Sequence, residues 1–156
     1  MKLIYIDNVL SKEANKNAFD KFNCNRQSSP SVWFNIDEFP ECIAPLVEIA
    51  AKEFDLSSCV GFEVWTHYNT GPNWHYDKDE YLSQYSNELK FPLCSIAYYV
   101  QVNNLIGGDF LTKNLRITPQ TNSVALFSAG VYHKVEPYTG ERFALLITPW
   151  QYKPNL

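Results

Sequence analysis

The sequence predicts a mostly β domain with the double-sheet jelly-roll architecture, preceded by two supporting helices. Two stretches in the first third have apolar residues at helical spacing, and from Cys59 onward the spacing changes to a period of two. About eight short strand patterns with regular turn signals follow, which is typical of jelly rolls. The 156 residues, 46% of them hydrophobic, are enough for one core. We therefore expect a single domain over residues 1–156 whose core spans about 59–150.

The N-terminal third predicts a supporting framework. Leu3–Ile6 is a short apolar strand, and Ser11–Phe22 is a helix that begins with a good N-cap residue. The polar segment Asn23–Pro30 indicates a surface loop, and Val32–Ile36 indicates a short strand after it. From Pro40 to Phe54, apolar side chains recur at helical spacing, so we expect an amphipathic helix that covers a sheet.

The middle of the chain changes from strands to a long irregular segment. Val60–Tyr68 alternates as a strand, Asn69–Pro72 has turn residues, and Trp74–Asp77 reads as a second strand close to the first. Lys78–Pro92 is polar and has neither a strand nor a helix period, which predicts a long loop. Loops of this length beside a site are often functional lids.

The remainder of the chain predicts short strands only. Gly107 and Gly108 are interpreted as a turn or bulge and not as a phosphate cradle, because a strand and no helix follows them. A turn at Pro137–Gly140 is expected to join the last two strands into a hairpin. The strands expected are Leu93–Val102, Gly108–Leu111, Leu115–Ile117, Ser123–Phe127, Tyr132–Glu136 and Arg142–Trp150.

Composition argues against several classes of function. A net charge of −4 argues against broad binding to nucleic acids or anionic membranes, because both need a positive surface. The N-terminal apolar stretch meets Asp7 too early for a secretory signal, and no apolar run approaches the roughly 20 residues of a membrane span. We therefore expect a cytoplasmic protein. The cysteines form no Cys-x-x-Cys pair and are expected to be reduced and mostly buried; they are Cys24, Cys42, Cys59 and Cys94.

Three side chains of the chain suit a metal ion. His75 and Asp77 stand two residues apart in a predicted strand, so their side chains share one face. His133, the only later histidine, begins another alternating run and supplies a third ligand. Two histidines and one carboxylate with open coordination positions form the facial triad of non-heme Fe(II) oxygenases. Asp79 and Glu80 are weaker alternatives to Asp77.

Arg142 is the candidate anchor for an anionic ligand. It lies nine residues after His133 (142 − 133 = 9) and precedes an apolar stretch, so we place it on the strand adjacent to the one that begins at His133. A guanidinium stays charged in an apolar cavity and grips a carboxylate with two hydrogen bonds. His67, the remaining histidine, is interpreted as a polar residue on a strand face and not as a metal ligand.

Several motifs follow one another in a fixed order along the chain. They are His75-x-Asp77, Ala97-Tyr98-Tyr99-Val100, Gly107-Gly108-Asp109-Phe110, the run from Phe127 to Val135 that contains His133, the run from Tyr138 to Arg142, and Trp150. This ordered set resembles the Fe(II)/2-oxoglutarate-dependent dioxygenases of the prolyl 4-hydroxylase type. The resemblance covers roughly residues 60 to 150, and a lone His-x-Asp would not carry it.

The resemblance implies a distorted double-stranded β-helix, cupin-like in architecture, and a set of cofactors. It implies Fe(II) on the triad, 2-oxoglutarate with its far carboxylate on Arg142, and O₂ as oxidant, with ascorbate as a possible reductant. By the family's pattern, Tyr68 and Tyr99 are candidates to contact the co-substrate. The implied products are succinate, CO₂ and a hydroxylated substrate.

The substrate that the resemblance implies is a prolyl residue in a peptide or protein. Tyr81, Tyr85 and Trp74 are expected near the mouth of the site, where aromatic rings suit an extended, proline-rich chain. Tyr76 points to the other face of its strand and is interpreted as a packing residue. Lys78–Pro92 is the segment expected to face the substrate.

Two other functions remain open on the sequence alone. One is a non-catalytic, cupin-like module that binds a metal or another ligand, for which Arg142 would have no obvious role. The other is a zinc hydrolase that uses the same three ligands, since zinc accepts these ligand types, although no nearby general base is evident.

Overall fold

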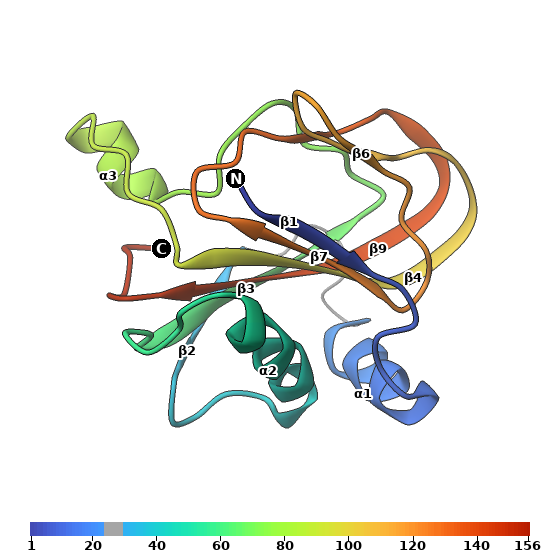
Figure 1. Cartoon of the computed structure of the whole chain (residues 1–156), viewed down its shortest axis with the longest axis horizontal. Coiled ribbons are helices and arrows are strands. Elements are labelled where there is room, and N and C mark those ends of the chain that lie inside the picture. The colour runs from blue at the N-terminus through green and yellow to red at the C-terminus, as the bar shows by residue number, and fades with distance from the viewer. Residues whose placement is uncertain (24–29) are drawn as a thin grey trace.

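The computed structural model describes residues 1–23 and 30–156, and it is mostly β, with two antiparallel sheets. The larger sheet has the strand order β1-β7-β4-β9-β3-β2, and the smaller one has the order β6-β5-β8. Figure 1 shows the smaller sheet above one face of the larger sheet. The strands are β1 (Leu3–Ile6), β2 (Val32–Asn35), β3 (Gly61–Tyr68), β4 (Cys94–Gly107), β5 (Phe110–Leu111), β6 (Arg116–Ile117), β7 (Ser123–Ser128), β8 (Lys134–Val135) and β9 (Tyr138–Trp150).

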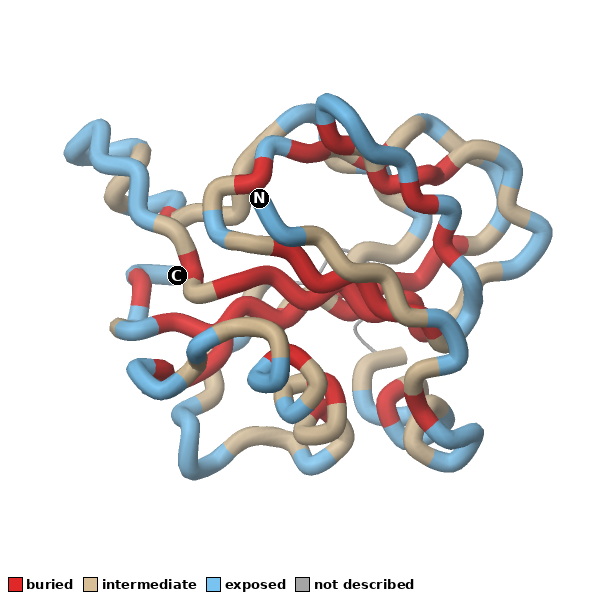
Figure 2. The backbone as a smooth tube through the Cα atoms, viewed as in Figure 1, coloured by how far each residue is buried: buried red, intermediate tan, exposed pale blue. Residues whose placement is uncertain are grey.

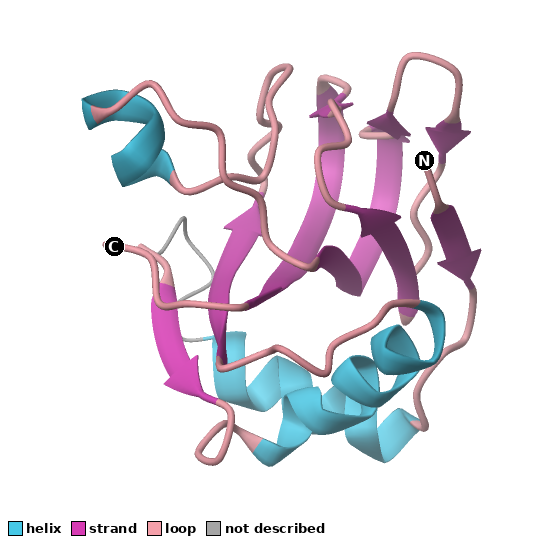
Figure 3. Ribbon diagram, turned by 60° about the vertical axis from the view of Figure 1, so that its left-hand side comes forward, coloured by secondary structure: helices cyan, strands magenta, loops and turns pink. Residues whose placement is uncertain are grey.

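Two helices cover the other face of the larger sheet. They are α1 (Lys12–Phe22) and α2 (Ala44–Glu53), and a short 3-10 turn, η2 (Glu41–Ile43), leads into α2. Both helices lie together on that face, whereas α3 (Glu80–Tyr85) stands apart, beyond the edge of the sheet (Figures 1 and 3). No helix in the described part of the chain combines the length and the apolar character that crossing a membrane requires.

Alternation along the central strands divides the interior into two cores. On β9, Phe143, Leu145 and Ile147 pack against the helices, whereas Ala144 and Leu146 belong to a second core on the opposite face. Strand side chains alternate between faces, so each central strand serves both cores. Buried backbone accordingly follows the strands of the larger sheet (Figure 2). The second core is the one that surrounds the candidate site.

Most elements expected from the sequence are present with shifted ends. The first strand and the first helix are confirmed, and Ser11 caps that helix by accepting a hydrogen bond from the Ala14 amide. The helix expected from Pro40 is divided into the 3-10 turn η2 and the helix α2. Pro45 fits the first turn of α2, because an amide hydrogen is not needed there. Of the expected loop Asn23–Pro30, residues 24–29 lie outside the described part.

Three expectations about elements are wrong. Trp74–Asp77 is not a strand; it contributes only an isolated bridge between His75 and His133. Lys78–Pro92 is not all loop, because Asp79 caps the helix α3 within it. The last two strands form no hairpin: β8 pairs with β5, whereas β9 is flanked by β4 and β3. Since both edges of β9 are already occupied, the segment at His133 belongs to the other sheet.

Candidate metal centre

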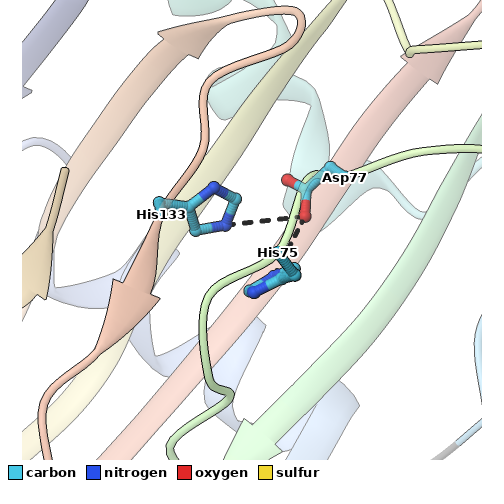
Figure 4. A group of neighbouring side chains, drawn as sticks. All are labelled: His75, Asp77 and His133. Carbon is cyan, nitrogen blue, oxygen red and sulfur yellow. Dashed lines mark ion pairs between the residues drawn. The ribbon is translucent and has the colours of Figure 1, made fainter. Parts of the chain in front are cut away.

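His75, Asp77 and His133 converge between the two sheets (Figure 4). One ligand atom from each lies within 4.8 Å of the others. The Nε2 atoms of His75 and His133 are 3.5 and 3.6 Å from Asp77 Oδ1, respectively. The two histidines are held opposite each other by paired backbone hydrogen bonds of 2.9 and 3.0 Å. A single ion could bind all three donors, because each ligand bond is only about 2.0–2.2 Å long.

The backbone selects the ring nitrogen that each histidine presents. His75 Nδ1 lies 2.6 Å from the Asn73 carbonyl oxygen, and His133 Nδ1 lies 2.8 Å from the Val131 carbonyl oxygen. A carbonyl oxygen can only accept, so each Nδ1 carries the hydrogen. In the neutral ring the lone pair is then on Nε2, which faces Asp77. This arrangement orients both imidazoles for a metal ion.

Asp77 is fixed from the other side by the larger sheet. The Ser95 hydroxyl, on β4, donates to Asp77 Oδ2 at 2.6 Å and leaves Oδ1 directed at the histidines. Burial alone would raise the pKa of Asp77, but contacts with His75, His133 and Ser95 outweigh it and hold the pKa below its usual value. The carboxyl group is therefore ionised, as a metal ligand must be.

The pKa values of the two candidate histidine ligands are shifted in opposite directions. Burial disfavours the charged form of His75, but the hydrogen bond to Asp77 and the Asn73 carbonyl outweigh it and raise the pKa. Burial dominates at His133 and lowers its pKa, because Asp77 offsets it only in part. His133 therefore stays neutral to a lower pH than His75.

A cavity continues from the three residues towards Arg142 and Tyr99. The Arg142 side chain is buried, and its Nε donates to the Gly108 carbonyl at 2.9 Å. Its guanidinium carbon lies 5.0 Å from the centre of the Tyr99 ring. Among the described residues, no carboxylate forms an ion pair with Arg142, and the buried Tyr99 hydroxyl has no hydrogen-bond partner. This inner cavity thus holds a buried positive charge and a hydroxyl that are both available to an anion.

A second, outer cavity of about 290 Å³ opens from the same residues. Both cavities are lined by His75 and Asp77, so they meet at the candidate metal centre. The outer cavity is also lined by Ser31, Glu63, Trp65, His67, Pro72, Tyr76, Lys78, Glu80, Thr148 and Trp150.

The expectation for Tyr68 is corrected by the direction of its side chain. Tyr68 packs against the helix-side core, and its hydroxyl donates to Glu141 at 3.1 Å. His67, its neighbour on β3, instead lines both cavities. The family's pattern indicates Tyr68, but its side chain points to the helix side, because adjacent strand residues point to opposite faces.

His67 and Trp65 are site residues that the sequence reasoning missed. The Trp65 indole donates to His67 Nε2 at 3.2 Å, and the Thr70 hydroxyl lies 3.3 Å from His67 Nδ1. Burial, with the positive charge of Arg142, lowers the pKa of His67 to about 4, so its ring is neutral. The alternation from Val60 to Tyr68 could have revealed both residues if the inward face had been known.

The aromatic residues expected at the mouth are only partly there. Tyr81 and Tyr85 are exposed on α3, and their tilted rings contact each other with centroids 4.6 Å apart, outside both cavity linings. Trp74 stacks on Tyr132 at 5.3 Å, and Tyr132 in turn contacts Tyr76, which lines the outer cavity. Tyr76 therefore packs as expected, but the expectation that it points away from His75 and Asp77 is wrong, because all three line the outer cavity.

Asp79 and Glu80, the weaker alternatives to Asp77, are engaged elsewhere. Asp79 Oδ1 accepts from the Leu82 amide at the start of α3, and its Oδ2 accepts from the Tyr152 hydroxyl at 2.8 Å. Glu80 pairs with Lys78 at 3.2 Å. Neither is among the residues that converge at the candidate metal centre.

No protein-family model matches this sequence, and no curated protein matches it. Several solved structures, however, are similar to the structure of this chain. A viral collagen prolyl hydroxylase from Paramecium bursaria Chlorella virus-1, in complex with 2-oxoglutarate, has a TM-score of 0.68 at 17% identity, covering 98% of this chain and 97% of that one. A Pseudomonas putida prolyl-4-hydroxylase has a TM-score of 0.66 at 13% identity, covering 97% and 93%.

The chain has the prolyl hydroxylase fold. A third structure, a Trichoplax adhaerens prolyl hydroxylase in complex with a peptide fragment of hypoxia inducible factor, has a TM-score of 0.63 at 14% identity, covering 96% of this chain and 83% of that one. The resemblance inferred from the motifs is thus confirmed at the level of the fold. The prolyl hydroxylase fold extends over nearly the whole chain and includes the N-terminal strand and helices.

Proposed function

We propose that this chain is an Fe(II)- and 2-oxoglutarate-dependent dioxygenase that hydroxylates a prolyl residue in a peptide or protein. The architecture proposed is the double-stranded β-helix, a cupin-like jelly roll, in which the two antiparallel sheets enclose the site. Fe(II) would be held by His75, Asp77 and His133, whose donor atoms lie within 4.8 Å of one another. Two nitrogen donors and one carboxylate on one side of an ion are the donor set of this class.

The observation that carries the proposal is the buried positive charge in the inner cavity. Arg142 is 2% exposed and has no ion-pair partner among the described residues. Burying an unpaired charge is costly, so a site that keeps one is built for an anion. The dicarboxylate 2-oxoglutarate matches the chemistry of these groups: one end would bind the metal, and the other would pair with Arg142 and the Tyr99 hydroxyl.

Each residue of the site has a role that follows from its contacts. Together Fe(II), 2-oxoglutarate and O₂ supply the oxidising power for an unactivated C–H bond, with release of succinate and CO₂. The Asn73 and Val131 carbonyls hold the two imidazoles so that Nε2 faces the ion. Ser95 holds Asp77, and the apolar walls formed by Phe110, Phe127 and Leu146 exclude water from the inner cavity.

The outer cavity is where the substrate would enter. It joins the inner cavity at His75 and Asp77, and Tyr76 at its edge contacts Tyr132, which stacks on Trp74. Proline rings pack well on aromatic faces, and one structure of the same fold holds a peptide fragment. These features support a peptide substrate and, together with the fold, a prolyl target.

The proposal is tested by turnover. Purified chain with Fe(II), ascorbate, 2-oxoglutarate and O₂ is incubated with a set of proline-containing peptides and with matched peptides that carry alanine in place of proline. We expect succinate formation and a gain of one oxygen atom on the proline peptides, and neither with His75→Ala. Absence of succinate with every peptide, in a folded protein that binds Fe(II), would favour the non-catalytic binding module.

A further inference from the structure

Glu63 places a carboxylate in the outer cavity, on the substrate side of the candidate metal centre. It lies on β3 and lines the cavity together with Trp65 and His67, which have the same strand parity. Glu63 precedes His67 by four positions, which corresponds to about 13 Å along a strand. The carboxylate therefore shares the cavity with His75 and Asp77 but is not among the three candidate metal ligands.

Neutral donors hold the Glu63 carboxylate in place. The Trp150 indole donates to Glu63 Oε2 at 3.2 Å and also lies 3.1 Å from the Thr148 hydroxyl oxygen. Trp150 is only 1% exposed, so its indole is fixed by the core. The Ser31 hydroxyl also hydrogen-bonds to Glu63. These contacts orient the carboxylate without neutralising its charge.

In the part of the chain that the structure describes, the charges that line the outer cavity leave Glu63 without a counter-ion. Lys78, the cation of this cavity, pairs with Glu80 at 3.2 Å, and Asp77 belongs to the metal centre. Within residues 1–23 and 30–156, Glu63 forms no ion pair. Burial raises the pKa of Glu63, and the charges of Asp77 and Asp79 add to the effect, although Ser31 and Trp150 oppose it. Among the described residues, the Glu63 carboxylate thus lacks a cation that would compensate its burial.

We propose that Glu63 is a specificity residue that binds a cationic group of the substrate, the ammonium of a lysine or the guanidinium of an arginine. The inference rests on the proposed function, because it takes the outer cavity as the substrate site. An extended peptide advances about 3.3–3.6 Å per residue, and a basic side chain adds its own length. The cation therefore belongs two to four positions from the residue that is oxidised.

Peptide binding in the absence of turnover tests this proposal. The chain is loaded with Fe(II) and 2-oxoglutarate under anaerobic conditions and titrated by calorimetry. The probes are blocked peptides with one central proline and with lysine, glutamine or glutamate placed two, three or four positions to either side. At one position at least, we expect the lysine peptide to bind about tenfold or more tightly than the glutamine peptide, and the glutamate peptide more weakly than either.

Variants assign the preference to one carboxylate. Glu63→Gln keeps an acceptor for the Trp150 indole and removes the charge, so we expect the lysine and glutamine peptides to bind within about twofold of each other. Glu80→Gln, which removes another carboxylate from the same cavity, should keep the tenfold preference. Circular dichroism and 2-oxoglutarate affinity show that each variant is folded. Raising the salt concentration should weaken the preference in the unmodified chain.

The outcomes that overturn the proposal are specific. An equal affinity for the lysine and glutamine peptides at all positions overturns it, as does a preference that survives Glu63→Gln. Lack of binding by every peptide, in a chain that binds 2-oxoglutarate, also overturns it. Failure of the proposed function is distinct, because it shows as missing succinate in the aerobic assay, whereas the charge preference is read from binding alone.

Discussion

Tyr99 and Tyr68 lie on central strands, but they face different cores. Tyr99 lines the inner cavity beside Arg142, whereas Tyr68 packs on the helix side and contacts Glu141. We expect Tyr99→Phe to weaken 2-oxoglutarate binding about tenfold, the effect of one lost hydrogen bond. Tyr68→Phe serves as the matched control and should leave the affinity unchanged. Anaerobic calorimetry measures both, and an equal loss in the two variants would contradict the assignment.

Ser95 is expected to act on the metal through Asp77. Its hydroxyl donates to Asp77 Oδ2 at 2.6 Å and fixes the carboxylate that faces both histidines. Removing such an outer contact typically lowers metal affinity about 10–100-fold, and we expect Ser95→Ala to do so. Ser123→Ala, which removes another buried serine hydroxyl that donates to the Gln120 carbonyl, is the control. Unchanged Fe(II) affinity in Ser95→Ala would show that Asp77 is held without this bond.

Metal binding should weaken as the pH falls. A protonated imidazole cannot bind a metal, and the pKa of His75 is raised above 6.5, so protons compete with the ion near neutral pH. The lowered pKa of His133 removes it from this competition. Below the pKa of His75, we expect affinity to fall by up to about tenfold per pH unit. Calorimetric titrations between pH 8 and pH 6 measure this, with thermal unfolding as a check of folding, and a flat profile would contradict it.

For single residues, the sequence predicts which side chains can form the site better than it predicts which way each side chain points. His75, Asp77, His133 and Arg142 could be predicted because their residue types and order indicate a metal and an anion. The face of β3 that lines the site could not be predicted, since alternation gives two equivalent sets of side chains. Only contacts with the helices decide which set points towards the site. The family's pattern indicates Tyr68, whereas the structure has His67 in the site.

The short helix α3 depends on two hydrogen bonds to Asp79. Asp79 accepts from the Leu82 amide at the helix start and from the Tyr152 hydroxyl of the C-terminal segment. Loss of such a cap typically costs about 1 kcal/mol, so Asp79→Ala should accelerate amide hydrogen exchange over residues 80–90 without changing 2-oxoglutarate affinity. Tyr152→Phe, which removes only one bond, should have a smaller effect. Protection that is the same in all three proteins would contradict the role of Asp79.

Elements with a strong period were predicted well, and elements without one were not. The strand β3 alternates, and β4, β7 and β9 contain continuous runs of buried residues, whereas α3 has no buried residue and thus no apolar stripe to signal it. The expected final hairpin failed for another reason. Neighbouring strands with a turn between them favour pairing, but here β4 and β3 already occupy both edges of β9.

At the scale of the whole molecule, the site exists only where the two sheets face each other. Arg142 lies on β9 of the larger sheet, and His133 precedes β8 of the smaller one. The inner cavity between them is lined by residues that are far apart in the sequence, from Trp65 to Leu146. The order of the motifs predicts which residues meet, because resemblance to a family also implies that family's strand topology. Local periodicity alone could not predict this, since it places His133 and Arg142 on adjacent strands.

The central claim, that the triad and Arg142 together bind one metal and one dicarboxylate, is tested most directly by anaerobic titration. The apo chain receives Fe(II) and then 2-oxoglutarate while its visible absorption is recorded, with His75→Ala and Arg142→Ala measured alongside. We predict a charge-transfer band that requires His75 and weakens without Arg142. A folded protein that gives no such band, or one whose band is indifferent to Arg142, would contradict the account.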